Sequence, residues 1–123
     1  MTGKKILLVD DSPVILTMER MILSKGPYEL VVARNGREAL EKVRAEHPDL
    51  ILMDQRMPVL DGMAAVRELR ADPAHAELPV IMLTGSSEAR DVEEAFASGC
   101  SDYLVKPIDA AALLAKVRSL LGE

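Results

Sequence analysis

The sequence has few of the side chains on which stacked cofactors, disulfide bonds and zinc sites depend. It has no tryptophan, and its two tyrosines and one phenylalanine bring aromatic residues to only 2% of 123 residues. A single cysteine, Cys100, excludes an intramolecular disulfide bond. Cys100 also has no familiar zinc-ligand spacing to the two histidines, His47 and His75. We therefore expect Cys100 to fill a buried space rather than to react.

Long apolar runs and clusters of positive charge are also missing. No segment approaches the length that spans a membrane, and two aspartates end the first apolar run before it could act as a secretory signal. The 15 lysines and arginines are scattered and the net charge is −5, which argues against a nucleic-acid-binding surface. We expect a cytoplasmic protein with no membrane and no nucleic-acid partner.

The residues that are present suffice for one domain. An apolar content of 49% can build one core of normal depth in a chain of this length. No repeat, linker or low-complexity segment divides the sequence. We expect a single domain over residues 1–123.

Short apolar runs alternate with longer amphipathic segments, which is typical of β-α units that build a parallel sheet. Three of the runs consist almost entirely of Ile, Leu, Val and Met, as in strands buried on both faces. The predicted strands are residues 5–9, 29–33, 50–53, 80–83 and 103–105. The sequence therefore predicts an α/β fold of five βα units, (βα)5, with a doubly wound parallel sheet of five strands.

Five helices are predicted between and after these strands. The first opens with Ser12 as N-cap and Pro13 at the first helical position, and it stops at 25–27. The others cover about 37–46, from near 62 to a break at 72–73, 88–98 and 110–121. The helix at 88–98 offers only Val92, Ala95 and Phe96 to a core, so we expect it to be weakly anchored.

The first helix has more apolar residues than one buried face can use. Ile15, Met18 and Ile22 have the spacing of a core stripe, and Val14 and Met21 form a second stripe. The second stripe is either additional core or a docking surface for a partner protein.

The residues that follow the predicted strands could carry chemistry. In open parallel sheets ligands bind beyond the carboxyl ends of the strands, where the strand order reverses. Asp10 and Asp11 follow the first strand, Asp54 the third, Thr84 the fourth and Lys106 the fifth. In the flavodoxin-like strand order 2-1-3-4-5, three carboxylates would meet beside a hydroxyl and an ammonium group. Such a cluster needs a cation, and oxygen-only ligands favour Mg²⁺.

Each of these residues also has a plain structural role open to it. Asp10 or Asp11 could cap the first helix, and Asp54 could begin a turn. Thr84 could simply end a strand, and Lys106 could be an exposed charge. The dipeptide at 61–62 is expected to be a turn that leads into a helix cap. The coincidence of these residue types at the strand ends favours a functional site.

Four segments of the chain resemble the receiver domain of two-component response regulators, in the order and spacing of that family. They are Val9-Asp10-Asp11-Ser12, Met53-Asp54-Gln55-Arg56-Met57-Pro58-Val59-Leu60-Asp61-Gly62, Met82-Leu83-Thr84-Gly85 and Asp102-Tyr103-Leu104-Val105-Lys106-Pro107. The resemblance implies a phosphoprotein of a phosphorelay, in which Asp54 takes a phosphoryl group from a phosphohistidine and forms an aspartyl phosphate. It further implies that Asp10, Asp11, Asp54 and the backbone carbonyl of Arg56 hold Mg²⁺.

The resemblance also implies roles for the residues around the phosphoryl group. Lys106 would pair with phosphoryl oxygens, and Thr84 would donate its hydroxyl to one of them. The family pattern also implies that the Lys106-Pro107 peptide bond is cis. Tyr103 matches the switch aromatic that turns inward with Thr84, although it could be only a half-buried strand residue. Arg56 occupies the position that sets phosphoryl lifetime in the family, although it could be only a solvated side chain.

The family resemblance implies signal transduction rather than turnover of a separate substrate. The phosphodonor would be a sensor histidine kinase or a histidine phosphotransfer protein, and the domain would catalyse only its own phosphorylation and dephosphorylation. The output would be a downstream protein target or an output domain not present in this chain, so we expect either a stand-alone receiver or one excised domain.

Three other functions fit the sequence less well. A Mg²⁺-dependent phosphohydrolase with an aspartyl nucleophile would need a general acid two residues after a nucleophile on the first strand, where this chain has Ser12. A flavin-binding module of the flavodoxin type would need aromatic residues to cover the ring. An adaptor with an inactive site would not need the intact set of acids, hydroxyl and lysine.

Overall fold

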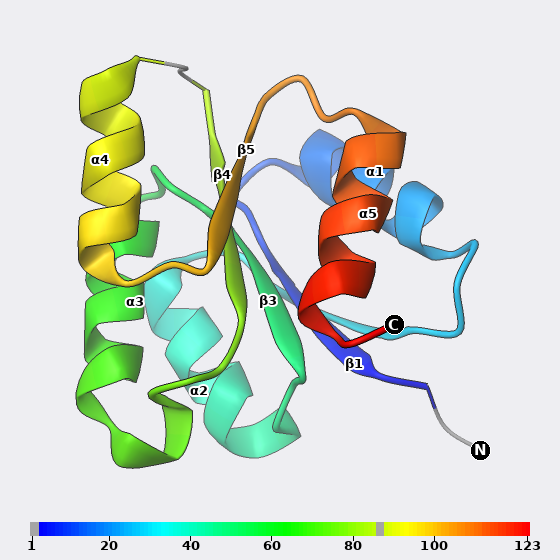
Figure 1. Cartoon of the computed structure of the whole chain (residues 1–123). Coiled ribbons are helices and arrows are strands. Elements are labelled where there is room, and N and C mark those ends of the chain that lie inside the picture. The colour runs from blue at the N-terminus through cyan, green and yellow to red at the C-terminus, as the bar shows by residue number, and fades with distance from the viewer. Residues whose placement is uncertain (1–2, 86–87) are drawn as a thin grey trace.

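The computed structural model describes residues 3–85 and 88–123, and this part of the chain forms one parallel sheet of five strands (Figure 1). The strands are β1 (Lys5–Val9), β2 (Glu29–Ala33), β3 (Leu50–Asp54), β4 (Val80–Thr84) and β5 (Asp102–Val105). Their order in the sheet is β2-β1-β3-β4-β5, which confirms the predicted topology. Each predicted strand is present, and the bounds differ by at most one residue at one end.

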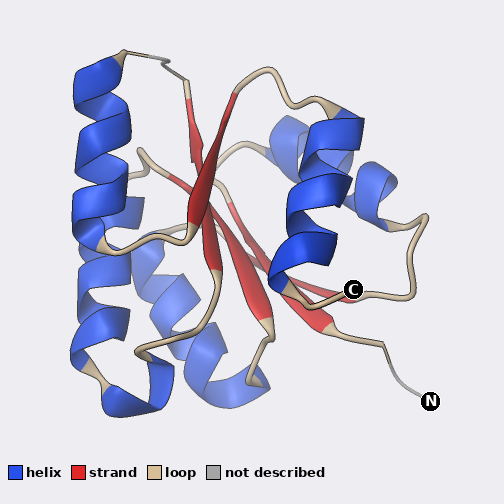
Figure 2. Cartoon of the chain, in the orientation of Figure 1, coloured by secondary structure: helices blue, strands red, loops and turns tan. Residues whose placement is uncertain are grey.

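Helices cover both faces of the sheet (Figures 1 and 2). They are α1 (Pro13–Leu23), α2 (Gly36–Glu46), α3 (Gly62–Ala71), α4 (Ala89–Ser98) and α5 (Ala110–Leu120), with a short 3-10 helix, η1 (Pro73–His75), after α3. Helices α1 and α5 pack on one face, and α2, α3 and α4 pack on the other. The doubly wound arrangement expected from the sequence is therefore present.

The core has two layers that share the central strands. Along β3, Leu50 and Leu52 face the α1 and α5 layer, while Ile51 and Met53 face the other helices. This alternation follows from the two-residue period of a strand. Burial on both faces explains the continuous apolar runs at 6–9 in β1, 50–53 in β3 and 80–83 in β4. Cys100 is buried, with 8% of its surface exposed, as expected.

Side chains fix the starts of the helices that lie next to the carboxyl ends of the strands. The hydroxyl of Ser12 accepts a hydrogen bond from the backbone N–H of Ile15, and Pro13 is the first residue of α1. Asp61 accepts one from the backbone N–H of Ala64 at 2.8 Å and so caps α3. The Ser12 cap was predicted, and the dipeptide at 61–62 was expected to be a turn leading into a cap. Each side chain provides an acceptor for N–H groups that lack a partner within the helix.

The buried face of α1 differs from the predicted one by a shift of one residue along the helix. The buried residues are Leu16, Glu19 and Leu23, whereas Met18 is 36% exposed and Ile15 and Ile22 are only partly buried. The stripe predicted through Ile15 has the same helical spacing as the buried one, so spacing does not distinguish the two faces. Packing against the sheet selected the face that contains the glutamate.

The prediction for α4 was correct in part. Ala95 is fully buried, but Phe96 is 44% exposed and does not point into the core. Its ring instead meets the ring of Tyr103 edge to face, with centroids 5.5 Å apart. Ala95 and Ser98 are the buried residues of this helix, so its weak anchorage is confirmed. Among the described residues no helix combines the length and apolar character needed to cross a membrane.

Candidate functional site

Strand β1 ends in two acids that have different surroundings. Asp10 is completely buried, and its backbone N–H continues the pairing with β2 by donating to Ala33 at 3.2 Å. Its side chain accepts a hydrogen bond from the backbone N–H of Ser12 at 2.9 Å. Asp11 is exposed. Only Asp11 is therefore directly open to solvent, while Asp10 is held rigidly below it.

Asp54 is the last residue of β3, and tight packing of the next loop holds it in place. The backbone N–H of Gln55 donates to Leu83 of β4 at 2.8 Å, and that of Gly62 donates to Gln55 at 3.0 Å. A β-carbon at Gly62 would lie 2.2 Å from the carbonyl oxygen of Asp54, so only glycine fits there. The start of α3 is thus pressed against the end of β3. Asp54 itself is 6% exposed.

Lys106 bridges two of these acids from the end of β5. Its Nζ donates to Asp54 Oδ1 at 3.1 Å and to Asp10 Oδ2 at 3.2 Å. Its backbone N–H donates to the carbonyl of Thr84 at 2.8 Å, which holds the ends of β4 and β5 together. The Lys106-Pro107 peptide bond is cis, as the family resemblance implied.

Burial and the neighbouring charges shift the pKa values of Asp54 and Lys106. Burial raises the pKa of the Asp54 carboxyl, and the charge of Asp10 raises it further, while Lys106 opposes the rise. Burial by itself would lower the pKa of Lys106, but the hydrogen bonds and charges of Asp54 and Asp10 outweigh it, and the net shift is upward. Lys106 therefore stays protonated and offsets part of the negative charge of the cluster.

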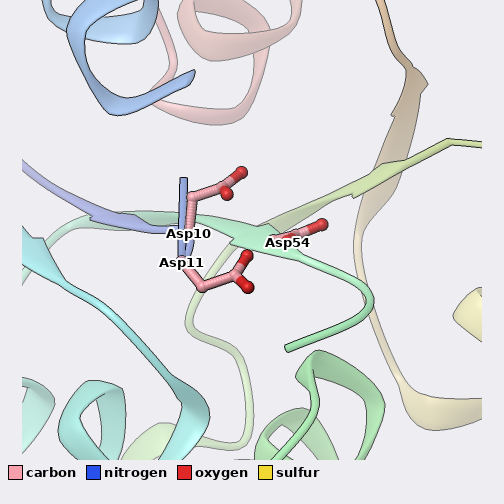
Figure 3. A group of neighbouring side chains, drawn as sticks. All are labelled: Asp10, Asp11 and Asp54. Atoms are coloured by element: carbon pink, nitrogen blue, oxygen red, sulfur yellow. The ribbon is translucent and has the colours of Figure 1, made fainter. Parts of the chain in front are cut away.

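Figure 3 shows that the side chains of Asp10, Asp11 and Asp54 extend toward the same side of the strand ends. Each offers a carboxylate oxygen, and these oxygens all lie within 4.8 Å of one another. A set made only of hard oxygen ligands fits a small divalent cation such as Mg²⁺. One ammonium group beside three carboxylates leaves an excess of negative charge, which a cation would also offset.

A cleft of about 360 Å³ opens beside this cluster. Its lining consists of Asp11, Asp54, Gln55, Arg56, Thr84, Gly85 and Lys106. The structure thus brings the strand-end residues predicted from the sequence to one place, with Asp10 buried behind them. Arg56 also lines the cleft, although its side chain is 70% exposed and forms an ion pair with Asp91.

Comparison with known proteins gives the family. The sequence profile described as "Response regulator receiver domain" matches residues 6–118. The chain belongs to this family of receiver domains. It is 37% identical to the DNA-binding dual master transcriptional regulator RpaA of Synechocystis over 117 residues, which are 95% of this chain and 48% of RpaA. It is also 32% identical to the polar-differentiation response regulator DivK of Brucella ovis over 98% of both chains.

A solved receiver domain with bound metal has nearly the same fold. The receiver domain of the sensor histidine kinase PA1611 from Pseudomonas aeruginosa, with a magnesium ion in its active-site cleft, superposes with a TM-score of 0.91. It is 36% identical, and the match covers 98% of this chain and 99% of that one. Receiver domains of two-component systems bind Mg²⁺ at an acidic pocket and interact with histidine kinases or phosphotransfer partners. Because this chain spans about half of RpaA, what RpaA does as a whole does not transfer directly.

Three of the residues singled out in the sequence lie outside the cleft of this receiver domain. Tyr103 is half-buried on β5, with its ring against Phe96 rather than in the cleft lining. Val14 and Met21 are 67% and 66% exposed on α1, so they are not the additional core that was left open as an alternative. Val14 lines a shallow surface cavity together with Pro13, Thr17 and Met18.

Glu19 was missed by sequence reasoning. It is fully buried, and neither carboxylate oxygen has a hydrogen-bond partner among the described residues. Burial raises its pKa to about 8, with a further contribution from the charge of Asp10. Its position between Leu16 and Leu23 at helical spacing indicates a buried glutamate. The apolar residues Ile15, Met18 and Ile22 on the same helix favoured a different buried face.

Proposed function

We propose that Asp54 is the phosphoacceptor of this receiver domain. One observation carries the proposal: Asp54 lines the cleft at the end of β3, where the ammonium group of Lys106 lies 3.1 Å from its carboxylate. A carboxylate oxygen of Asp54 attacks the phosphorus of a phosphohistidine, the phosphorus–nitrogen bond breaks, and the imidazole keeps the electron pair and takes up a proton. The product is an aspartyl phosphate.

The residues around Asp54 position and neutralise the transferred group rather than react with it. We assign Lys106 to the phosphoryl oxygens, because its ammonium already contacts the acceptor carboxylate. Thr84, buried at the end of β4 and part of the cleft lining, donates its hydroxyl to the same group. We further propose that this contact of Thr84 is linked to a movement of Tyr103 on the neighbouring strand.

Asp10, Asp11 and Asp54, with the backbone carbonyl of Arg56, would hold the Mg²⁺ ion. The support is the oxygen-only ligand set within 4.8 Å and the magnesium found in the cleft of the PA1611 receiver domain. When bound, the ion supplies positive charge that offsets the charge of the carboxylates and of the incoming phosphoryl group. In this chain Asp10 orients the site through its hydrogen bond with Ser12, and Lys106 screens Asp10 from Asp54.

The partners follow from the same assignment. We propose a sensor histidine kinase or a histidine phosphotransfer protein as phosphodonor, with docking on the exposed Val14 and Met21 of α1. The output is a downstream protein or an output domain, as the RpaA name suggests for a relative, and no separate substrate is turned over.

Because such relatives regulate transcription, we place the protein in the cytoplasm. We assign residues 1–123 to one receiver domain.

The alternative of a Mg²⁺-dependent phosphohydrolase is not favoured. Such an enzyme would use an aspartate of the first strand and a general acid two residues later. In this structure Asp10 is completely buried, and the residue two positions later, Ser12, uses its hydroxyl to cap α1.

Labelling with acetyl phosphate tests the assignment of Asp54. We expect Asp54→Asn to abolish covalent labelling, because an amide is a poor nucleophile of nearly the same shape. Wild type should gain one phosphoryl group, located at Asp54 by mass spectrometry, and should do so only with Mg²⁺ present. Asp49→Asn changes an exposed aspartate just before β3, at the opposite end of the strand from Asp54; it is the matched control and should be labelled like wild type. Full labelling of Asp54→Asn would refute the proposal.

A further inference from the structure

The two residues that follow Asp54 both reach the first turn of α4. The side-chain amide of Gln55 donates to the backbone carbonyl of Asp91 at 3.3 Å, and Arg56 Nη2 lies 3.3 Å from Asp91 Oδ1. Gln55 is almost completely buried, at 1% exposed, so its contact is shielded from solvent. The loop of the acceptor aspartate is thus joined directly to α4 through one residue, Asp91.

These contacts join the first turn of α4 to the loop that follows Asp54. The buried residues of α4, Ala95 and Ser98, and its ring contact through Phe96 all belong to the second half of the helix. A segment with few buried contacts opens at low free-energy cost. The contacts of Asp91 with Gln55 and Arg56 contribute to the attachment of the first turn.

Arg56 lies between two anionic positions. Its residue lines the cleft that contains Asp54, while its guanidinium is paired with Asp91, whose side chain is only 19% exposed. A guanidinium is a planar donor whose geometry matches both carboxylate and phosphoryl oxygens. A phosphoryl group on Asp54 would therefore compete with Asp91 for the same side chain.

We propose that Asp91 is a positioning residue that holds Arg56 on α4, away from the phosphoryl group, and thereby shortens the lifetime of the aspartyl phosphate. The proposal rests on Asp54 as the phosphoacceptor. In hydrolysis, a water oxygen bonds to phosphorus, the phosphorus–oxygen bond to Asp54 breaks, and the Asp54 carboxylate leaves with the electron pair. Inorganic phosphate forms, and the proton of the water passes to the phosphate or to solvent.

Arg56 slows this reaction when its guanidinium pairs with the phosphoryl oxygens or covers the approach of water. The ion pair with Asp91 limits the fraction of time that Arg56 spends at the phosphoryl group. The same competition has a consequence for α4, because each transfer of Arg56 to the phosphoryl group removes the contact of Arg56 with the first turn of this helix. Phosphorylation then loosens that turn by a route that does not pass through Thr84 or Tyr103.

A mutant cycle on the hydrolysis rate tests this role. Wild type, Asp91→Asn, Arg56→Asn and the double variant are labelled with acetyl phosphate and Mg²⁺, the phosphodonor is removed, and loss of the label is followed by mass spectrometry. We expect Asp91→Asn to lengthen the lifetime several-fold, because the freed guanidinium pairs with the phosphoryl group. Arg56→Asn should shorten it several-fold, and the double variant should match Arg56→Asn.

The matched control is Glu93→Gln, which makes the same charge change at an exposed position of α4 and should leave the lifetime unchanged. Asp91→Asn keeps the backbone carbonyl that Gln55 contacts, so α4 should stay folded, which circular dichroism checks. If Asp91→Asn does not fold, the Arg56→Asn variant provides the test. An aspartyl phosphate lifetime in Arg56→Asn equal to that of wild type overturns the inference.

The outcomes also separate this inference from the proposed function. Absence of label at Asp54 in wild type would overturn the phosphoacceptor assignment itself. Normal labelling combined with an Asp91→Asn lifetime equal to wild type would overturn only the role of Asp91. An effect of Asp91→Asn that persists unchanged in the Arg56→Asn background would show that Asp91 does not act through Arg56, and would overturn it as well.

Discussion

The carboxyl group of Glu19 is buried on the α1 and α5 side of the sheet without a hydrogen-bond partner among the described residues. Its pKa is raised from an ordinary value of 4.5 to about 8, first by burial and then by the charge of Asp10. The folded protein therefore keeps a proton on Glu19 over a pH range in which the unfolded chain releases it. The contribution of protonated Glu19 to the free energy of unfolding is fully present below pH 4.5 and is lost as the pH rises through 8.

We expect the free energy of unfolding of wild type to fall between pH 5 and pH 8.5 relative to a Glu19→Leu variant. The difference should be on the order of 1–3 kcal/mol, because leucine has no charge to bury at the higher pH. Urea unfolding followed by circular dichroism at the two pH values measures it. Glu19→Gln, which also cannot ionise, should follow the pH dependence of Glu19→Leu. Parallel curves for wild type and both variants would contradict the raised pKa.

At the scale of the element, α1 has one face buried against the sheet and an exposed face that we propose as a docking surface. Leu16, Glu19 and Leu23 face the sheet, and the exposed Val14 and Met21 lie on the outer side of a helix that begins directly after Asp11. Exposed apolar side chains beside an active site are a common feature of protein-docking surfaces. Docking at this surface would place a phosphodonor near Asp54.

We expect Val14→Glu to slow phosphoryl transfer from the phosphodonor protein about tenfold or more, because a charge would have to be buried in the interface. Labelling by acetyl phosphate should be unchanged, since the small donor needs no docking surface. Transfer rates with both donors make the comparison. Ala45→Glu, an exposed change on α2 across the sheet, is the control and should transfer normally. Equal loss with both donors would indicate misfolding instead of lost docking.

At the scale of the whole molecule, the two helix layers depend on the same five strands. Tyr28 packs against the core under α1 and α5, and Tyr103 packs against the core under the other helices. The chain has no tryptophan and two tyrosines. When one tyrosine is replaced, the fluorescence of the remaining tyrosine reports on the helix layer that it contacts. A small domain with one shared sheet is expected to unfold in a single step.

We expect Tyr28→Phe and Tyr103→Phe to give fluorescence transitions in urea that each coincide with the far-ultraviolet circular dichroism of the same variant. The reason is that neither layer can keep its core once the shared strands separate. Midpoints that differ between fluorescence and circular dichroism would show that one layer unfolds first. They would also contradict the assignment of residues 1–123 to one cooperative domain.

The sequence by itself determined the fold class and the contents of the candidate site. Continuous apolar runs required strands buried on both faces, and helix caps such as Ser12 and Asp61 satisfy local N–H groups, so neighbouring residues were enough to predict them. Asp10, Asp54 and Lys106 were visible because each lies at the carboxyl end of a strand, and parallel strands bring these ends to one edge of the sheet.

Only the tertiary structure decided which face of α1 is buried and what the residues after Asp54 contact. The stripes that contain Glu19 and Met18 have equal spacing, and the choice depends on how the whole helix packs on the sheet. The contacts of Gln55 and Arg56 with Asp91 join positions more than 30 residues apart. Such contacts arise only when β3 and α4 are brought together by strand pairing, which no local pattern of residues encodes.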